Sequence, residues 1–289
     1  MSQRVIWEQR EILIWGKTRP EISKTYREIV CTGGVFREDR RLVRIYPVPL
    51  RYLEDERVFR KYQWIRAYVT KAPSDPRPES YKIRYDDIEV LDRIPTERGG
   101  NWDKRAACIM NPENIVASVE ELQAQQRATG RSLALTRPLK VIDVAADRLS
   151  SREREGFWSR YRSAVAQMEL PLDPETGREI KPLSPPDYRF RIEFRCDDPR
   201  CTKPHVFSVL DWELDALYFR QRQSRSDQQA AHDVVAKLRE TCGPDRDLHF
   251  FLGNISSHPQ TFTIVGLWSP KKKEEKETQE KPQLPLFEE

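Results

Sequence analysis

Short stretches of alternating apolar and polar residues dominate the first hundred positions of the chain and predict β-strands. Isoleucine, valine, tyrosine and tryptophan are concentrated in these stretches, and proline, glycine and charged residues separate them. Such residues favour a pleated, half-buried surface, so the pattern predicts a small sheet or barrel. The expected strands span residues 11–16, 28–36, 42–46, 63–70 and 88–94, with a short helix between 49 and 62.

Helical spacing of apolar positions follows and alternates with further strands. Helices are expected at 102–110 and 112–128; the second has Asn111 as its cap, Pro112 at its first position and Gly130 after its end. A proline-rich loop after residue 168 is the best candidate for a domain boundary. The remaining elements are a strand at 133–144, a helix at 151–168, strands at 188–195 and 206–210, helices at 212–223 and 227–241, and a hairpin of 248–253 with 261–268.

The fold class predicted from these elements is α+β. A basic first domain, 1–149, is β-rich and forms either a barrel-like structure or a small sheet. A helix and proline-rich connection, 150–187, leads to a mixed α+β domain, 188–269, which carries a loop with two cysteines and a histidine. The composition of residues 270–289 predicts a disordered tail.

Composition excludes several classes of protein. Hydrophobic residues make up 38% of the 289 positions and charged residues 33%, which is typical of a globular protein with a polar surface. No apolar run approaches the roughly 20 residues that span a bilayer, and the N-terminus has no signal-peptide core. We therefore expect a cytoplasmic protein that does not associate with a membrane. Five cysteines are an odd number in a long chain, which favours reduced thiols or metal ligands over disulfides.

Positive charge is concentrated between residues 37 and 84, with 13 Lys/Arg against 7 Asp/Glu, although the whole chain carries only +4. Tyrosine, tryptophan and phenylalanine are frequent in the same window. Arginine neutralises phosphates and flat rings stack on exposed bases, so the combination indicates a nucleic-acid surface, most directly for DNA. The expected contacts are Arg41, Arg44, Arg51 and Arg66. The alternative is that the rings belong to the core and the arginines to a solvated face.

Cys196, Cys201 and His205 lie in one loop between two expected strands. A tight hairpin can bring three such side chains to one ion, and a structural zinc site takes four ligands. Cys242 or His249 is a candidate for the fourth. The sequence therefore predicts a structural zinc ion. The alternative is a pair of inert cysteines with a surface histidine.

No complete catalytic signature is present in the sequence. Asp187, Glu193 and Arg195 follow the order of residues in metal-dependent restriction nucleases, but residues six apart on one strand lie about 20 Å apart. Asp211 and Asp215 share a helix face and could bind a cation, although acidic residues in a first turn also offset the helix dipole. An enzyme, most directly a metal-dependent nuclease with a site assembled from distant segments, stays open as an alternative.

Five short segments, 17–20, 23–26, 44–49, 61–65 and 211–214, resemble a group of uncharacterised bacterial proteins. This resemblance extends over most of residues 12–268 and implies that the body is one recurring bacterial unit. It implies no activity.

Residues 283–287, glutamine-leucine-proline-leucine-phenylalanine, follow a run of mixed charge from 270 to 282 and precede two glutamates. This pentapeptide resembles the one with which bacterial proteins bind the replication sliding clamp, from which Pro285 departs. The resemblance implies the clamp as a partner, with Gln283, Leu284, Leu286 and Phe287 as the contacts. The preceding run would reach roughly 20 Å as a flexible linker. The alternative is that the apolar end packs on the body of its own chain.

These patterns predict an accessory protein of DNA metabolism, in repair, replication or defence, that binds nucleic acid and docks on the sliding clamp. Besides the nuclease, the sequence also allows a protein-interaction scaffold without nucleic-acid contact.

Overall fold

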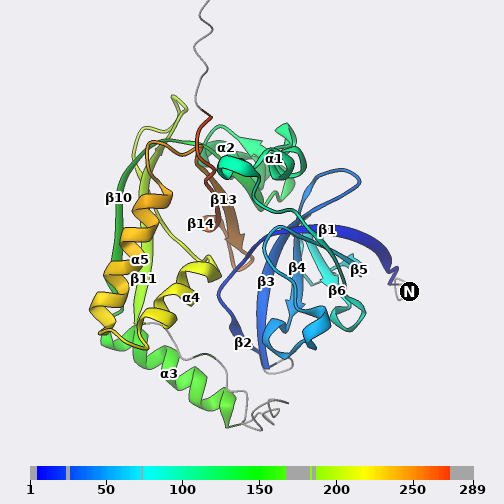
Figure 1. The fold of residues 1–289 in the computed structure, drawn as a ribbon, viewed down its shortest axis with the longest axis horizontal. Helices are drawn as coiled ribbons and strands as arrows, with labels where there is room; N and C mark the ends of the chain where they lie inside the picture. Colours follow the sequence, from blue (N-terminus) through cyan, green and yellow to red (C-terminus); the bar gives the residue numbers. More distant parts are fainter. Residues whose placement is uncertain (1–4, 24–26, 73, 167–182, 184–186, 274–289) are drawn as a thin grey trace, which may run out of the picture.

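The computed structural model describes residues 5–23, 27–72, 74–166, 183 and 187–273. Figure 1 shows a β-barrel built from the first half of the chain beside a mixed part of strands and helices built from the second half. The predicted α+β class is confirmed, and the β-rich first half is a barrel. No helix within the described ranges has the length and apolar character needed to cross a membrane.

Five strands close the barrel. Neighbouring strands pair antiparallel except β4 and β6, which are parallel, and β5 completes the ring by pairing with β1. If the five barrel strands are numbered 1 to 5 in sequence order, their order around the ring is 1-2-3-5-4. This strand order is that of the OB fold. The strands, in ring order, are β1 (Glu8–Lys17), β3 (Arg27–Phe36), β4 (Leu42–Val48), β6 (Ser80–Ile83) and β5 (Gln63–Lys71).

Alternate residues of these strands fill the barrel, because successive side chains of a strand point to opposite sides. Ile14, Ile45 and Ile65 are fully buried in its interior. The strand β6, which is needed to close the ring, is absent from the sequence prediction. The expected helix between 49 and 62 consists of two short 3₁₀ helices, η1 (Leu50–Tyr52) and η2 (Asp55–Arg57).

Short elements surround the barrel. The strand β2 (Glu21–Ser23) extends β3, and β7 (Glu89–Arg93) pairs with β5 on the outside. The first half ends with η3 (Tyr85–Asp87), η4 (Arg98–Gly100) and the helix α1 (Asp103–Ile109).

The second half contains two sheets. A four-stranded sheet is formed by β14 (His258–Trp268), β13 (His249–Ile255), β9 (Leu133–Thr136) and β8 (Ile115–Val116). A three-stranded sheet is formed by β10 (Pro138–Arg148), β11 (Tyr188–Cys196) and β12 (His205–Ser208). The helices α4 (Trp212–Gln221) and α5 (Asp227–Thr241) share a core with both sheets, in which Phe194, Tyr218 and Phe250 are buried.

Two further predicted elements differ from the structure. The helix expected at 112–128 starts later, as α2 (Val119–Thr129), because Asn111 caps only the 3₁₀ helix η5 (Pro112–Asn114) and Ser118 caps α2 itself. The strand expected at 133–144 is two strands in different sheets, β9 and β10. The strand β9 pairs with β13, and β10 pairs with β11. Residues 115–148, which the sequence prediction placed in the first domain, therefore complete the sheets of the second half. The helix α3 (Ser151–Val165) follows β10 as expected.

The outer face of the barrel packs against the four-stranded sheet. Trp15 of β1 stacks on Phe251 of β13, with ring centroids 4.0 Å apart and planes inclined by 2°. Its indole donates a hydrogen bond to the carbonyl of Gly34 at 2.8 Å. A Cβ atom at Gly33 would collide with the Trp15 ring, so this position of β3 has no room for a side chain. The second half therefore covers the outer side of β1 and β3.

Candidate metal centre and nucleic-acid interface

The loop between β11 and β12 brings its two cysteines and its histidine together. In the antiparallel pair, Phe194 lies opposite His205, so Cys196 at the end of β11 and His205 at the start of β12 lie at the same end of the hairpin. The chain turns tightly between them, with the amide of Cys201 donating to the carbonyl of Asp198 at 2.9 Å. Cys201 Sγ lies 3.4 Å from His205 Nε2. The sequence predicted these three side chains to converge, and they do.

The fourth member of the group is Glu120, in the first turn of α2. Its Oε1 atom lies 3.1 Å from His205 Nε2. The ligand atoms of Glu120, Cys196, Cys201 and His205 all lie within 4.8 Å of one another. In a tetrahedral site with metal bonds of about 2.0 to 2.3 Å, ligand atoms are about 3.3 to 3.8 Å apart. The four side chains are therefore close enough to hold one metal ion.

Cys242 and His249, the fourth ligands suggested by the sequence, do not belong to this group. Cys242 follows the last turn of α5, where burial raises the pKa of its thiol to about 12. His249 starts β13, and its Nδ1 lies 3.8 Å from Asp247 Oδ1. The pattern Ser118-Val-Glu-Glu121 marks a helix start and places Glu120 in a first turn, but nothing in one sequence connects that turn with the distant loop.

Burial and hydrogen bonding at the group fit a bound cation. Cys196 and Cys201 are 3% and 8% exposed, and burial raises the pKa of the Cys196 thiol. Glu120 Oε2 is buried and has no hydrogen-bond partner among the described residues. A divalent cation would stabilise the thiolates and compensate the carboxylate oxygen together. Two sulfurs, an imidazole and a carboxylate suit a cation of borderline softness.

Further contacts hold the loop against the start of α2. Arg200 Nη2 lies 2.6 Å from Asp198 Oδ2, and hydrogen bonds from Arg200 hold the pKa of Asp198 well below its usual range. The same nitrogen lies 3.5 Å from Glu121 Oε2. Ser118 accepts a hydrogen bond from the amide of Glu121 at 3.1 Å and so fixes the first turn that carries Glu120.

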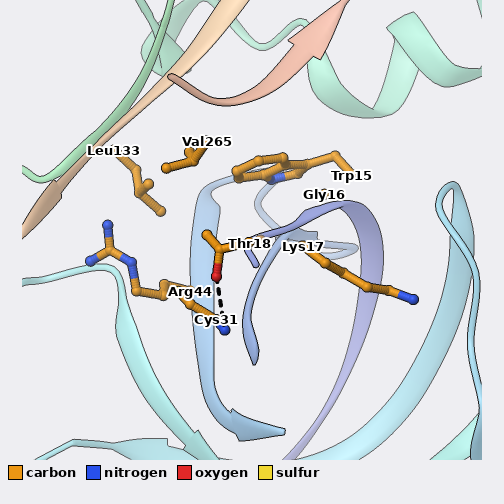
Figure 2. Close-up of a pocket in the computed structure, with 9 residues that line it drawn as sticks. Trp15, Gly16, Lys17, Thr18, Cys31, Arg44, Leu133 and Val265 are labelled. Atoms are coloured by element: carbon orange, nitrogen blue, oxygen red, sulfur yellow. Dashed lines mark hydrogen bonds between the residues drawn. The ribbon is translucent and has the colours of Figure 1, made fainter. Parts of the chain in front are cut away.

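The four arginines expected to contact DNA do not form one exposed surface. Arg44 is only 6% exposed, because the second half of the molecule lies over the outer face of β4. Its Nη1 donates to Ser132 Oγ at 3.2 Å. Figure 2 shows Arg44 with Cys31 and Leu133 around a small pocket at the contact between barrel and second half. A phosphate in solvent cannot reach this guanidinium without a separation of the two halves.

The other three arginines are bound to carboxylates of their own chain. Each is partly exposed, but a phosphate would compete with an existing ion pair. The partners are Asp39 for Arg41, Glu28 for Arg51, and both Glu11 and Glu89 for Arg66, at 2.6 to 2.7 Å.

Three of the four acidic residues considered for a cation or nuclease site, Asp187, Asp211 and Asp215, lie in separate ion pairs. Within the described ranges, the group at Cys196 is the one set of three or more metal-ligating side chains that converges. Asp211 also caps α4, since it accepts a hydrogen bond from the amide of Glu213 at 2.9 Å. The pairs are Asp187 with Arg154 and Arg222, Asp211 with Lys61, and Asp215 with Arg19, at 3.4 to 3.8 Å.

Two family models match the chain in succession. Domain of unknown function (DUF8758) matches residues 8–111, which contain the barrel and α1, and Domain of unknown function (DUF8757) matches residues 115–289. No curated protein matches the chain.

Among the solved structures that match, one aligns over most of the chain. It is a chain of a replication protein A heterotrimer bound to single-stranded DNA, with 13% identity and a TM-score of 0.23 over 92% of this chain. This chain spans 66% of the length of that chain, slightly less than two thirds. A TM-score of this size does not establish a shared fold.

Proposed function

This chain belongs to the family Domain of unknown function (DUF8757), and we propose that it is an accessory protein of DNA metabolism that binds nucleic acid and docks on the bacterial sliding clamp. The observation that carries the nucleic-acid part is the strand order of the barrel. Barrels of the OB type bind oligonucleotides and oligosaccharides, so the argument is an analogy at the level of the fold. The excess of basic residues between 37 and 84 favours a polyanion as the ligand.

The contact between the two halves limits where nucleic acid can bind. OB barrels hold their ligands on the outer face of the second and third strands, which are β3 and β4 in this chain. The four-stranded sheet covers part of that face, as the burial of Arg44 and the stacking of Trp15 on Phe251 show. The proposal therefore requires a nucleic-acid surface that includes residues elsewhere on the molecule.

The clamp-docking part of the proposal rests on the C-terminal motif. Residues 283–287 lie outside the described residues and inside the range that DUF8757 matches. The last described residue, Lys273, lies beside α1, with Nζ 2.8 Å from Asp103 Oδ1. The intervening residues, 274–282, would reach about 17 Å as a flexible chain. Such a tether would raise the local concentration of the body at clamp-bound DNA.

For the group at Cys196 we propose zinc in a structural role. Zinc is bound by cysteine, histidine and carboxylate side chains, and four protein ligands leave no open position for a substrate. The ion would connect the β11–β12 hairpin to the start of α2, elements that are far apart in the sequence. Its contribution to the function is then the stability of the second half.

Binding to DNA tests the nucleic-acid part of the proposal. We expect labelled single- or double-stranded oligonucleotides to bind the intact protein with an affinity that falls linearly with salt on a log–log plot. Fluorescence anisotropy at several salt concentrations measures this slope. Absence of salt-dependent binding to any DNA or RNA would contradict the proposal and leave the protein as an interaction scaffold.

Binding to the purified bacterial clamp tests the docking part. The double variant Leu286→Ala/Phe287→Ala removes the apolar side chains of the motif and should abolish clamp binding in surface plasmon resonance. The control Glu288→Ala/Glu289→Ala changes the neighbouring positions and should retain it. DNA affinity should be the same in both variants. An unchanged clamp affinity in the first variant would exclude this motif as the docking site.

A further inference from the structure

The helix α3 differs from the other described α-helices in that none of its side chains is buried. Figure 1 shows it running from the end of β10 below the second half towards β2, which it contacts. Its aromatic residues Phe157, Trp158 and Tyr161 are half-buried on one side. The rings of Trp158 and Tyr161 meet edge to face with centroids 5.4 Å apart. The rings define the inner side of the helix and leave the opposite side to solvent.

Arginine and small residues make up most of the solvent side of α3, together with Glu155, whose carboxylate is paired with Arg162. Residues three and four positions apart lie on the same side of a helix, so this side is a continuous surface without aromatic rings. All of its members are exposed. They are Arg152, Glu155, Gly156, Ser159, Arg160 and Ser163.

The two arginines of this surface, Arg152 and Arg160, differ in their contacts from the arginines of the barrel. Arg152 and Arg160 form no ion pair with any residue that the structure describes, and Arg160 packs over the ring of Phe157 at 4.8 Å. Arg41 and Arg66 of the barrel, by contrast, are bound to carboxylates at 2.7 Å. Among the described residues, no acidic side chain has to be displaced for a phosphate to approach Arg152 and Arg160.

Gly156 in the middle of this surface has no structural reason to be glycine. Glycine destabilises the interior of a helix relative to alanine, and its backbone here is helical. A Cβ atom at this position would meet no atom within 4 Å. The fold therefore leaves room for alanine. Glycine is useful at such a position where the backbone of another molecule comes close.

We infer that the exposed surface of α3 binds the sugar-phosphate backbone of duplex DNA, with Arg152 and Arg160 on phosphates and Gly156 allowing close approach. The inference rests on the proposed nucleic-acid function and adds the surface and the form of the DNA. Duplex DNA fits because this surface has charge but no exposed ring, whereas binding of single strands depends on base stacking.

The variant Arg152→Gln/Arg160→Gln tests this inference. Each lost phosphate contact lowers the slope of log affinity against log salt by about 0.9 for duplex DNA, so the expected decrease is about 1.8. The control Arg191→Gln/Arg225→Gln removes two arginines that are paired with carboxylates and lie outside residues 37–84, and it should leave the slope unchanged. A single strand of the same length should lose less affinity than the duplex. An unchanged duplex slope in the α3 variant, or an equal decrease in the control, would overturn the inference.

The variant Gly156→Ala separates a structural role of α3 from a role in DNA binding. Alanine favours the helix, so the melting temperature should rise, while the added methyl group should weaken duplex binding. A higher melting temperature with unchanged affinity would contradict the inference. If the intact protein binds no nucleic acid, the proposed function itself fails; if it binds duplex DNA and the α3 variants bind equally well, only the assignment of α3 fails.

Discussion

The individual side chains of the candidate metal centre fit a bound cation better than an empty site. Cys196 is buried beside a second thiol, and Oε2 of Glu120 is buried without a hydrogen-bond partner among the described residues. His205 lies between the Cys201 sulfur and the Glu120 carboxylate, at 3.4 and 3.1 Å. One bound cation would compensate the charges of the thiolates and the carboxylate and would bind the lone pair of the neutral imidazole nitrogen.

Elemental analysis of the purified protein should find about one zinc per chain. Cys201→Ser should lose the metal, and Glu120→Gln should bind it about 10- to 100-fold more weakly because the charge of the ligand is lost. Cys242→Ser, which changes a partly buried cysteine outside the group, should retain a full complement of zinc. A chelator should lower the melting temperature of the parent protein. Full zinc content in Cys201→Ser would show that the ion, if present, is bound elsewhere.

Sequence analysis predicted three of the four residues of this centre because they share one loop. Glu120 could not be predicted, since its position next to the loop is a product of tertiary packing. The same reason explains Arg44. Strand alternation places it on the outside of β4, but only the structure shows that another sheet covers that side.

At the level of whole elements, local signals determine what can be predicted. The strands β1, β3, β4 and β5 follow the alternation of apolar residues, whereas the short β6 gives too little pattern to be recognised. Pro112 suggested the start of a long helix, but the capping serine, Ser118, lies six residues later and is fully buried. Both Asn111-Pro112 and Ser118 are sequence signals for the start of a helix. Only the tertiary packing shows that α2 begins at the second signal.

Removal of helix caps separates stability from metal binding. Ser118 caps α2 and Ser150 caps α3, each by accepting a hydrogen bond from an amide of the first turn. Ser118→Ala and Ser150→Ala should each lower the free energy of unfolding by about 1 kcal/mol, measured by chemical denaturation. Only Ser118→Ala should also weaken zinc binding, because it loosens the turn that carries Glu120. Equal metal affinity in the two variants would argue against Glu120 as a ligand.

At the scale of the molecule, polar contacts as well as apolar ones join the barrel to the second half. Arg19, which follows β1, lies 3.5 Å from Asp215 of α4, and Lys61, which precedes β5, lies 3.5 Å from Asp211. Burial raises the pKa of Asp215 to about 6, although the charge of Arg19 opposes the increase. This junction should therefore respond to pH.

The stability of the protein should decrease as pH rises from about 4 to 6 through the contribution of Asp215. In this range the folded protein binds the Asp215 proton more tightly than the unfolded chain does, so the free energy of unfolding falls with increasing pH. Asp215→Asn cannot titrate and should lack this contribution. Denaturant unfolding of both proteins at several pH values measures the difference. Parallel pH profiles for the two proteins would contradict the assignment.

Because the second half covers an apolar face of the barrel, the gene segments that encode the two halves should remain together during evolution. Leu13, Trp15, Leu42 and Trp64 lie on the outer side of the barrel in one cluster with Leu135 and Phe251 of the second half. A gene truncated after residue 111 would encode a barrel with these side chains in water, and apolar patches of this kind promote aggregation. Selection should therefore keep the two coding segments in one reading frame.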